Sequence, residues 1–552
     1  MISFATLSGL SMLVNLISLA AAQSQQAFQF TTDDASVNDQ WTTFPQRIER
    51  VAVIGAGPSG LQAATHLLAA NLSIRLFERA PAPGGQWFYT EETPVREQYP
   101  ETDARDTKIP PDILPATRYY EEGDGGISLD ERWREHWHPR PVWYDLIANS
   151  PADKTRLPGV NYAPDAAWEV SVHDVQRNVR AYASLHRLNS NDNPISSHAP
   201  QITSYATRVE SLHKGNETDT WTLKLHRLEW LPESKRLKAE WWTEEFDAVV
   251  VASGAFTEAK VPQIKGIGNW SKVKKDKKYS IYHAQSYRHP EPYTGKTVLI
   301  VGASVTATYL ARSIAPFAGR LLCSVRPNQY RDALGWDILF RFPEKAEMIP
   351  EIESFQPLDD FTAGIKAGKI NLVNGSAITE IDEIILATGY NTETFLPDLV
   401  KPRLPNSVYW TGHYMDDRPT LAYTLFNEPW RQGEYAGLGF ARVWTGKARL
   451  PSRERMWVNM KSGKYNFGKA VDFLRQEGLC RMYVSWLNSE ALEFGGQLVA
   501  PQLLERREIW NYWINTQHKK DFISHENWTR FEQLPFDEWP QPRYPSAKLV
   551  SW

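Results

Sequence analysis

Apolar and polar positions near the start of the chain predict a strand, a helix and a second strand in close succession. Val51–Ile54 is a continuous apolar run, which is typical of a parallel strand buried on both faces. Leu61, Ala64 and Leu68 then recur at the spacing of one helix face. The next run, Ser73–Phe77, predicts the second strand. This order is typical of an α/β unit with a parallel sheet.

The same order of patterns returns further along the chain. Thr297–Val301 is a run rich in β-branched residues, and Tyr309–Ile314 continues as a helix that Pro316 limits. Leu321–Val325 predicts a further strand. We therefore expect an α/β fold with two Rossmann-like dinucleotide-binding domains of three layers each.

The segments between and after these units predict how the two domains are joined. Residues 202–247 alternate apolar and polar, which predicts antiparallel strands. Two buried strands end in small residues, at Ala252–Gly254 and at Ala387–Gly389. We expect these ends to be twin crossings, so that the second domain is inserted in the first. Residues 88–140 are rich in Pro, Glu, Asp and Arg, which predicts a surface excursion.

Composition and charge mainly exclude classes of protein and kinds of site. The chain has 552 residues, 42% hydrophobic and 23% charged, as in an ordinary soluble enzyme of two domains. A net charge of −4 does not indicate a nucleic-acid partner. The two cysteines, Cys323 and Cys480, exclude a disulfide-dense scaffold, a cysteine metal cluster and a Cys-x-x-Cys redox pair. No His-Glu-x-x-His or Gly-x-Ser-x-Gly motif occurs, and we expect no metal.

The loop after the first strand has the glycine spacing of a dinucleotide-binding turn. Gly55 allows a tight turn, Gly57 lets backbone approach a pyrophosphate, and Gly60 lets the helix pack against the strand. Glu78 ends the second strand, where an acid can bind ribose hydroxyls. A turn that binds nothing is the alternative, but strand, loop, helix, strand and acid are all present. The candidate phosphate-binding residues are Gly55, Ala56, Gly57, Pro58, Ser59 and Gly60.

The second loop differs from the first in ways that change its expected ligand. Ser304 stands at the middle glycine position and Ala307 at the last, and Arg326 replaces the acid after the second strand. A guanidinium can bind a 2′-phosphate bidentately, whereas an acid would repel it, so we expect NADP here. A non-binding relic is the alternative. The candidate residues are Gly302, Ala303, Ser304, Val305, Thr306, Ala307 and Arg326.

Two turns outside the loops are candidates for contact with a flat cofactor. Gly84–Trp87 joins a glycine pair to a planar ring, and its candidate contacts are Gly85, Gln86 and Trp87. An ordinary turn with a packing Trp is the alternative. Asn149 precedes Ser150-Pro151, where its amide could cap the turn or reach a ligand.

The amino terminus predicts a route through the secretory pathway. Residues 2–22 are mostly apolar and end in Ala20–Ala22, which predicts cleavage before Gln23 and a secreted or secretory-pathway protein. No Lys or Arg precedes the apolar run, and an anchor in the endoplasmic reticulum membrane, with peripheral membrane contact, is the alternative. Sequons that permit glycosylation start at Asn71, Asn216, Asn269, Asn374 and Asn527.

From about Arg47 to Met456 the chain resembles the flavin-containing monooxygenases in their fungal form. The resemblance is carried by an ordered series: Gly55–Gly60, Gly84–Trp87, Asn149 before Pro151, Ala252–Gly254, Gly302–Ala307, Ala387–Tyr390, and Arg442–Gly446 leading to Leu450–Pro451.

The chain also departs from that family. Its identifying motif, Phe-x-Gly-x-x-x-His-x-x-x-Tyr/Phe, is matched at His283 and Tyr287, but Lys277 and Tyr279 stand where Phe and Gly are expected. A Trp at position 287 would instead resemble Baeyer–Villiger enzymes, so Tyr287 favours oxygenation of a heteroatom. Ala436 stands where the family often has a Gln on the flavin side.

The resemblance implies an oxidoreductase of the N,N-dimethylaniline monooxygenase type, with FAD at the first loop and NADPH at the second. Reduced FAD would take O₂ to give a C4a-hydroperoxide, which passes one oxygen to a nitrogen or sulfur atom of a small molecule, in fungal secondary metabolism. Asn149 is then the candidate catalytic residue, because a neutral amide can both donate and accept beside the flavin. His283 is expected to be structural. A flavoprotein oxidase or reductase, or Baeyer–Villiger oxygenation, stays open as the alternative.

The expected organisation has five parts. They are a signal peptide at 1–22, a flexible lead-in at 23–46, the first part of the FAD-binding domain at 47–262, the NADPH-binding domain at 263–387, and the second part of the FAD-binding domain with a helical cover at 388–552. The sequence does not indicate an oligomeric state.

Overall fold

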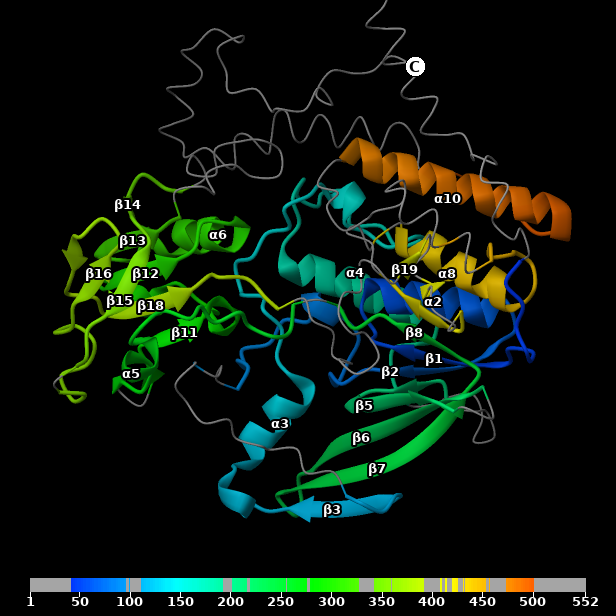
Figure 1. The fold of residues 1–552 in the computed structure, drawn as a ribbon, viewed down its shortest axis with the longest axis horizontal. Helices are drawn as coiled ribbons and strands as arrows, with labels where there is room; N and C mark the ends of the chain where they lie inside the picture. The colour runs from blue at the N-terminus through cyan, green and yellow to red at the C-terminus, as the bar shows by residue number, and fades with distance from the viewer. Residues whose placement is uncertain are drawn as a thin grey trace, which may run out of the picture.

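Two parallel sheets form the frame of the molecule, and each carries a helical layer on one face and a small antiparallel sheet on the other (Figure 1). The structure, a computed structural model, describes residues 41–95, 99, 111–191, 201–215, 219–254, 256–275, 278–326, 342–358, 360–391, 408–409, 413–414, 419–424, 430, 432–452, 456 and 473–500. The arrangement confirms the α/β fold with two Rossmann-like domains of three layers.

The first parallel sheet is organised around β1 (Arg50–Ile54), with the strand order β19-β20-β21-β8-β1-β2-β4. The strands from β21 to β4 run parallel, and β20 and β19 continue the sheet antiparallel. The other strands are β2 (Ser73–Phe77), β4 (Thr203–Ser204), β8 (Ala248–Val251), β19 (Val408–Tyr409), β20 (His413–Tyr414) and β21 (Leu421–Tyr423). Its helices are α2 (Pro58–Ala69), α4 (Val172–Leu185), α8 (Gln432–Trp444) and α10 (Phe473–Phe494).

Strand β1 is buried on both faces, as its apolar run predicts. Val51 and Val53 belong to the core shared with α2, α4 and α8. Ala52 and Ile54 belong to the opposite core, shared with the antiparallel sheet β3-β7-β6-β5. Successive side chains of a strand alternate between faces, so this double burial requires apolar residues throughout. The antiparallel strands are β3 (Ala116–Tyr120), β5 (Thr207–Lys214), β6 (Trp221–Leu231) and β7 (Arg236–Phe246).

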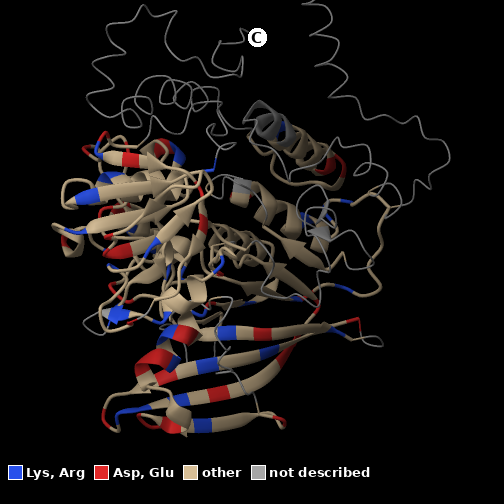
Figure 2. Cartoon of the chain, turned by 60° about the vertical axis from the view of Figure 1, so that its left-hand side comes forward, with Lys and Arg blue, Asp and Glu red and all other residues tan. Residues whose placement is uncertain are grey.

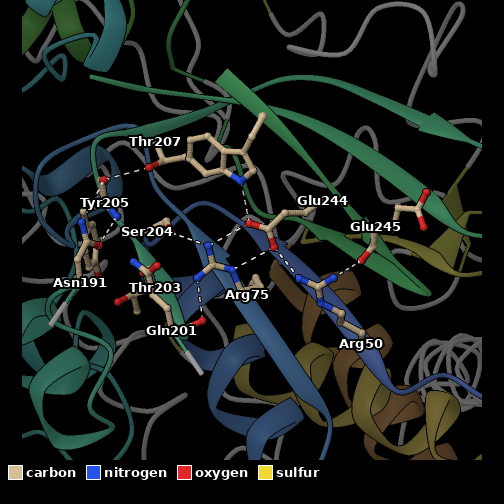
Figure 3. A network of polar contacts seen from close by, with 11 residues as sticks. Arg50, Arg75, Asn191, Gln201, Thr203, Ser204, Tyr205, Thr207, Glu244 and Glu245 are labelled. Carbon is tan, nitrogen blue, oxygen red and sulfur yellow. Dashed lines mark hydrogen bonds and ion pairs between the residues drawn. The ribbon is translucent and has the colours of Figure 1, made fainter. Parts of the chain in front are cut away.

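One carboxylate, that of Glu244 on β7, fastens the antiparallel sheet to the parallel one (Figure 3). Arg50 Nη2 lies 2.6 Å from Glu244 Oε2, and Arg75 Nη2 lies 3.1 Å from Oε1. Trp242 Nε1 donates to Oε1 at 3.0 Å. Burial alone would raise the pKa of Glu244, but the hydrogen bonds from Arg75 and Trp242 bring it below its ordinary value.

The second parallel sheet repeats this plan. Its order is β11-β18-β12-β13-β14, with all strands parallel. Val298 and Ile300 share a core with α6, whereas Leu299 shares one with Trp270 and the three-stranded sheet β15-β16-β17. The elements are α5 (Ile267–Ser271), α6 (Val305–Ile314), β11 (Ile281–His283), β12 (Thr297–Val301), β13 (Arg320–Ser324), β14 (Ala346–Ile349), β15 (Ile352–Phe355), β16 (Ile370–Leu372), β17 (Ala377–Ile378) and β18 (Glu383–Leu386).

The two strand ends with small residues lead into segments that run side by side. Beyond β8, Ala259 forms an antiparallel bridge with Tyr390, beyond β18. The Lys260 amide donates to the Gly389 carbonyl at 3.0 Å, and Thr388 Oγ1 donates to the Lys260 carbonyl at 2.5 Å. The chain therefore passes between the two sheets twice along one seam.

The segment expected to be a surface excursion is partly built into the fold, which corrects that expectation. It supplies β3 to the antiparallel sheet and forms α3 (Leu129–Trp137). Trp137 is 1% exposed and lies edge-on to Phe88, with ring centroids 5.6 Å apart. The polar composition of residues 88–140 did not reveal this burial, because the charged side chains of α3, such as Asp130 and Arg134, pair with each other at the surface.

Helix α8 packs closely on α2 because small residues line the contact. A Cβ at Gly437 would lie 2.8 Å from Ala63 Cα. Helix α10 lies on α8, and Arg442 Nη1 donates to the Leu487 carbonyl at 2.7 Å. The remaining elements are β9 (Lys274–Lys275), β10 (Lys278–Tyr279), η1 (Gly85–Trp87), η2 (Asp124–Gly126), η3 (Ala152–Lys154), η4 (Ala284–Ser286) and η5 (Glu291–Tyr293).

Acidic and basic residues are intermixed along the outer antiparallel sheet (Figure 2). In the part of the chain that the structure describes, no helix combines the length and the apolar character that a membrane crossing needs. The predicted signal peptide, residues 23–40 of the lead-in, Asn216 and Asn527 lie outside the described residues.

Candidate functional site

The first glycine loop makes a turn that side chains would prevent. Gly55 has φ +108°, and a Cβ there would lie 2.4 Å from the Ala252 carbonyl oxygen. A Cβ at Gly60 would lie 1.9 Å from the Gly55 carbonyl oxygen. The Gly55 amide donates to the Phe77 carbonyl at 2.7 Å, which holds the loop against β2. Glycine at these two positions is therefore required by close backbone approach.

Gly57 has a role that the glycine spacing alone did not predict. A Cβ on Gly57 would lie 3.3 Å from Gly85 Cα, and one on Gly85 would lie 2.6 Å from Gly57 Cα. The Gly84 amide also donates to the Ala56 carbonyl at 3.1 Å. The structure therefore brings the glycine loop and the Gly84–Trp87 turn together, although many residues separate them in sequence.

Helix α2 begins at this loop with unsatisfied donors. Gly57 is its N-cap and supplies no side-chain acceptor, and Pro58 follows at the first helical position. Among the described residues, no acceptor binds the amides of Ser59 and Gly60. These amides and the positive end of the helix dipole form a local anion-binding position.

Glu78 lies beside this position and is already held by three donors. Its Oε2 accepts from the Ala56 amide at 2.8 Å. Its Oε1 accepts from the Ala80 amide at 2.8 Å and from Arg140 Nη2 at 2.9 Å. A carboxylate offers about four acceptor positions, two on each oxygen, so one position on Oε2 stays available to a ligand. The side chain is 4% exposed, and the Arg140 charge compensates its burial.

The Gly84–Trp87 turn forms η1 and carries a buried donor without a partner. Trp87 Nε1 has no hydrogen-bond acceptor among the described residues, although the atom is buried. Its ring lies 5.9 Å from that of Trp430 and packs against the first domain's core. Gln86 is half-buried in the same turn. An orphaned buried donor beside a glycine loop fits a site that a polar cofactor completes.

Asn149 is exposed, next to Ala148, which belongs to the core that Trp87 packs against. The hydrogen bonds of its turn come from other residues: Ser150 Oγ lies 2.7 Å from Thr155 Oγ1, which also donates to the Pro151 carbonyl at 3.0 Å. Among the described residues no hydrogen bond engages the Asn149 side chain. Its catalytic role stays a prediction.

The second glycine loop reproduces the backbone of the first. Gly302 has φ +125°, and a Cβ there would lie 2.4 Å from the Ala387 carbonyl oxygen, as at Gly55 and Ala252. The Gly302 amide donates to the Ser324 carbonyl at 3.0 Å. Ser304 is the exposed N-cap of α6 and makes no side-chain cap. Ala303, Val305 and Thr306 are half-buried, and Ala307 is fully buried in the core.

Arg326 follows β13 and is exposed, with an acidic neighbour. Its Nε lies 2.8 Å from Glu351 Oε1, and the two side chains are 61% and 37% exposed. An ion pair this exposed contributes little to stability, so the guanidinium can be released for another anion at small cost. The pairing with Glu351 arises from the parallel contact of β13 with β14 and was not visible in the sequence.

His283 and Tyr287 form hydrogen bonds to the segment after β18 and, through Ser313, to Asp145. His283 Nδ1 accepts from the Gln285 amide at 3.2 Å, which leaves the proton on Nε2 to donate to the Gly389 carbonyl at 3.0 Å. Burial lowers the pKa of His283 to about 4. Tyr287 bonds Ser313 Oγ at 2.7 Å, and Ser313 donates to Asp145 at 2.6 Å. His283 is therefore a structural residue.

Sequence reasoning missed two buried arginines, Arg140 and Arg288. Arg140 pairs with Glu78, but 62 residues separate them. Arg288 donates to the carbonyls of Thr90 at 2.9 Å and Arg140 at 3.3 Å, and so joins the second domain to the first. In the sequence, Arg288 could be noticed only because it follows Tyr287 of the family motif, and that position does not reveal which carbonyls it contacts.

The two glycine loops lie at the carboxyl ends of the strands of two parallel sheets, and each can bind an anion. Parallel sheets bind nucleotides at this edge. Within the described residues there is no group of three or more His, Cys, Asp or Glu that could hold a metal. Both Cys323 and Cys480 are buried free thiols. The two loops themselves suit the binding of two dinucleotides.

Comparisons with known proteins agree with this geometry. Residues 49–322 match the family model described as pyridine nucleotide-disulphide oxidoreductase. The chain is 33% identical over 513 residues to flavin-containing monooxygenase iboF of Amanita muscaria, covering 84% of this chain and 94% of that protein. It is 27% identical to flavin-containing monooxygenase ustF2 of Aspergillus flavus, covering 80% and 92%. The solved S-allyl-L-cysteine S-oxygenase from Allium sativum has a TM-score of 0.55 at 18% identity, covering 88% of this chain and 99% of that one, which shows the fold alone.

Proposed function

Since the chain belongs to the flavin-containing monooxygenase family, we propose that it uses FAD and NADPH to transfer one oxygen atom of O₂ to a nitrogen or sulfur atom of a small molecule. The observation that carries the proposal is the matched pair of loops. A Cβ added at Gly55 would lie 2.4 Å from the Ala252 carbonyl oxygen, and one added at Gly302 would lie 2.4 Å from the Ala387 carbonyl oxygen. Two such loops in one chain suit two dinucleotides.

The residues of the first loop fit FAD. The amides of Ser59 and Gly60 at the start of α2 would bind its pyrophosphate. The free acceptor position on Glu78 Oε2 would take a ribose hydroxyl, and the orphaned Trp87 Nε1 would donate to the cofactor. When bound, FAD would supply the redox chemistry, by accepting a hydride from NADPH and activating O₂. The protein holds and orients it.

The residues of the second loop fit NADPH. The first turn of α6 would bind the pyrophosphate, and Arg326 would bind the 2′-phosphate in place of Glu351. We expect Arg326→Ala to weaken NADPH binding about tenfold and NADH binding hardly at all. Glu351→Gln should strengthen NADPH binding by a few-fold, because it removes the competing carboxylate. Equal losses for both nucleotides in Arg326→Ala would mean that Arg326 is structural.

Oxygen transfer to a soft nitrogen or sulfur needs little acid–base help from the protein. This agrees with His283, which is neutral and has both ring nitrogens engaged. Asn149 would stand beside the flavin as a neutral donor and acceptor. A flavoprotein oxidase is the second candidate, because the same loops would serve it.

The test of the proposed function is reduction of the bound cofactor. We expect the purified protein to be yellow with one FAD per chain, and NADPH added without oxygen to bleach the flavin absorbance. Readmitted O₂, with an amine or sulfide present, should give oxygenated product with little hydrogen peroxide. Stoichiometric peroxide with every substrate would favour the oxidase, and a colourless protein that does not take up FAD would contradict the proposal.

For the route of the protein, we propose entry into the secretory pathway by way of residues 1–22. The support is the Ala20–Ala22 end of the apolar run. Protein made in a secreting host should begin at Gln23 on amino-terminal sequencing. An intact Met1 on membrane-bound protein would instead support the anchor.

A further inference from the structure

The ion pair between Arg140 and Glu78 is a buried interaction beside the first loop that no sequence motif assigns. Arg140 Nη2 lies 2.9 Å from Glu78 Oε1, and the two side chains are 8% and 4% exposed. Glu78 Oε2 is bound to the loop itself through the Ala56 amide. Arg140 therefore binds one carboxylate oxygen while the glycine loop binds the other, and the two contacts together fix the orientation of the carboxylate.

Arg140 is itself held in place and still has a donor to spare. Its carbonyl accepts from Arg288 Nη2 at 3.3 Å, which ties its backbone to the second domain. Its Nε is buried and has no acceptor among the described residues. A buried charged donor without a partner is costly, and such groups usually meet a ligand or water.

The surroundings of this pair carry more positive than negative charge. Arg79 donates to Thr257 Oγ1 at 3.0 Å and has no ion pair among the described residues. Burial first, and then the charges of Arg79 and Arg140, hold the pKa of His138 well below its usual value. The Glu78 side chain accepts hydrogen bonds from the Ala56 and Ala80 amides and from Arg140 within this cationic group. An electron-rich polar ligand would complete the cluster.

We propose that Arg140 both orients and binds in the flavin site: it orients Glu78 so that Oε2 binds a hydroxyl of the adenosine ribose, and its own Nε–H donates to the same diol. The pair then offers an acceptor and a donor to two neighbouring hydroxyls. This inference rests on the proposed FAD site, and it adds a residue 62 positions away from Glu78 to that site.

The test compares five proteins by FAD titration of the stripped enzyme: wild type, Glu78→Gln, Arg140→Gln, the double variant, and Arg320→Gln. Arg320→Gln is the matched control, because it breaks a two-bond Arg–carboxylate pair with Glu347 on the second domain's exposed surface. Arg140→Gln and Glu78→Gln should each lose about ten- to a hundredfold in FAD affinity. The double variant should lose no more than either single one, because both act through one unit.

A second measurement separates positioning from mere support of the fold. ADP and 2′,3′-dideoxy-ADP are compared as competitors that displace FAD, so that only the first site is read. Wild type should prefer ADP, and Arg140→Gln should lose most of that preference. Arg140→Lys, which keeps the charge but has no Nε–H donor, should recover part of the FAD affinity.

The outcomes separate this inference from the proposed function. A wild type that does not bind FAD contradicts the proposed function. A wild type that binds FAD while Arg140→Gln keeps both full affinity and the preference for ADP overturns the role of Arg140. Additive losses in the double variant also overturn it, since independent residues would add. If Arg140→Gln does not fold, Arg140→Lys decides, and an unchanged preference for ADP in a weakened Arg140→Lys enzyme means a structural role only.

Discussion

Gly60→Ala should disable the first loop, because the added methyl group has no place to go. Its Cβ would lie 1.9 Å from the Gly55 carbonyl oxygen and 3.2 Å from the Ala252 Cβ. Ordinary non-bonded contacts need about 3.5 Å, so the start of α2 would have to move by well over an ångström. α8 opposes that movement, since a Cβ at Gly433 would already lie 3.3 Å from Ser59 Cα.

The cost of this clash falls at the upper end of overpacking. Inserted methyl groups cost about 1–3 kcal/mol where side chains can give way, and more where they cannot. Here the obstacle is a backbone carbonyl, so we expect about 3 kcal/mol. Since the amides of Ser59 and Gly60 would move with the helix, FAD affinity should fall on the order of a hundredfold.

The matched control is Ala307→Gly, the same position in the second loop. Ala307 is fully buried there, so the second unit accommodates the methyl group that the first cannot. Ala307→Gly should cost about 1 kcal/mol and leave FAD binding unchanged. The assay is FAD titration of stripped protein, with thermal unfolding of each variant in parallel. A Gly60→Ala protein with wild-type FAD affinity and stability would refute the reasoning.

Three further predictions concern Asn149, Arg288 and His283. Asn149→Ala should keep FAD and folding but release hydrogen peroxide at the expense of product, whereas unchanged coupling would remove Asn149 from the mechanism. Arg288→Met should lower stability in thermal unfolding by about 1–3 kcal/mol for each buried carbonyl that it leaves without a donor, such as those of Thr90 and Tyr287; a loss no larger than that of Arg320→Met would contradict this. Burial lowers the pKa of His283 to about 4 in the folded protein, against 6.5 for a solvated histidine, so stability should be full above pH 6.5 and fall by about 3 kcal/mol as the pH drops to 4. His283→Gln should flatten that slope, and an unchanged slope would mean that other groups cause it.

Sequence alone predicted what depends on local pattern. The loops at Gly55 and Gly302, their strands and their helices all follow from residues within one short unit, where spacing and periodicity carry the information. The twin crossings were also predictable, because Ala252–Gly254 and Ala387–Gly389 repeat the same small residues after apolar strands.

What sequence could not predict depends on contacts between distant segments. Gly57 lies close to Gly85, Arg140 pairs with Glu78, and Glu351 pairs with Arg326. Each of these contacts depends on tertiary packing or on strand pairing. Helix α3 and the burial of Trp137 were not predicted from the polar segment 88–140, because they too depend on contacts with distant segments. In each case the residue types were visible, but their neighbours were not.

The most direct test of the account is the fate of labelled oxygen. The enzyme is incubated with NADPH, ¹⁸O₂ and a panel of small amines and sulfides, and the products are analysed by mass spectrometry. The account predicts one ¹⁸O atom in an N- or S-oxide for each NADPH consumed, with label from O₂ and none from water. NADPH consumption that gives only labelled hydrogen peroxide across the panel would contradict it.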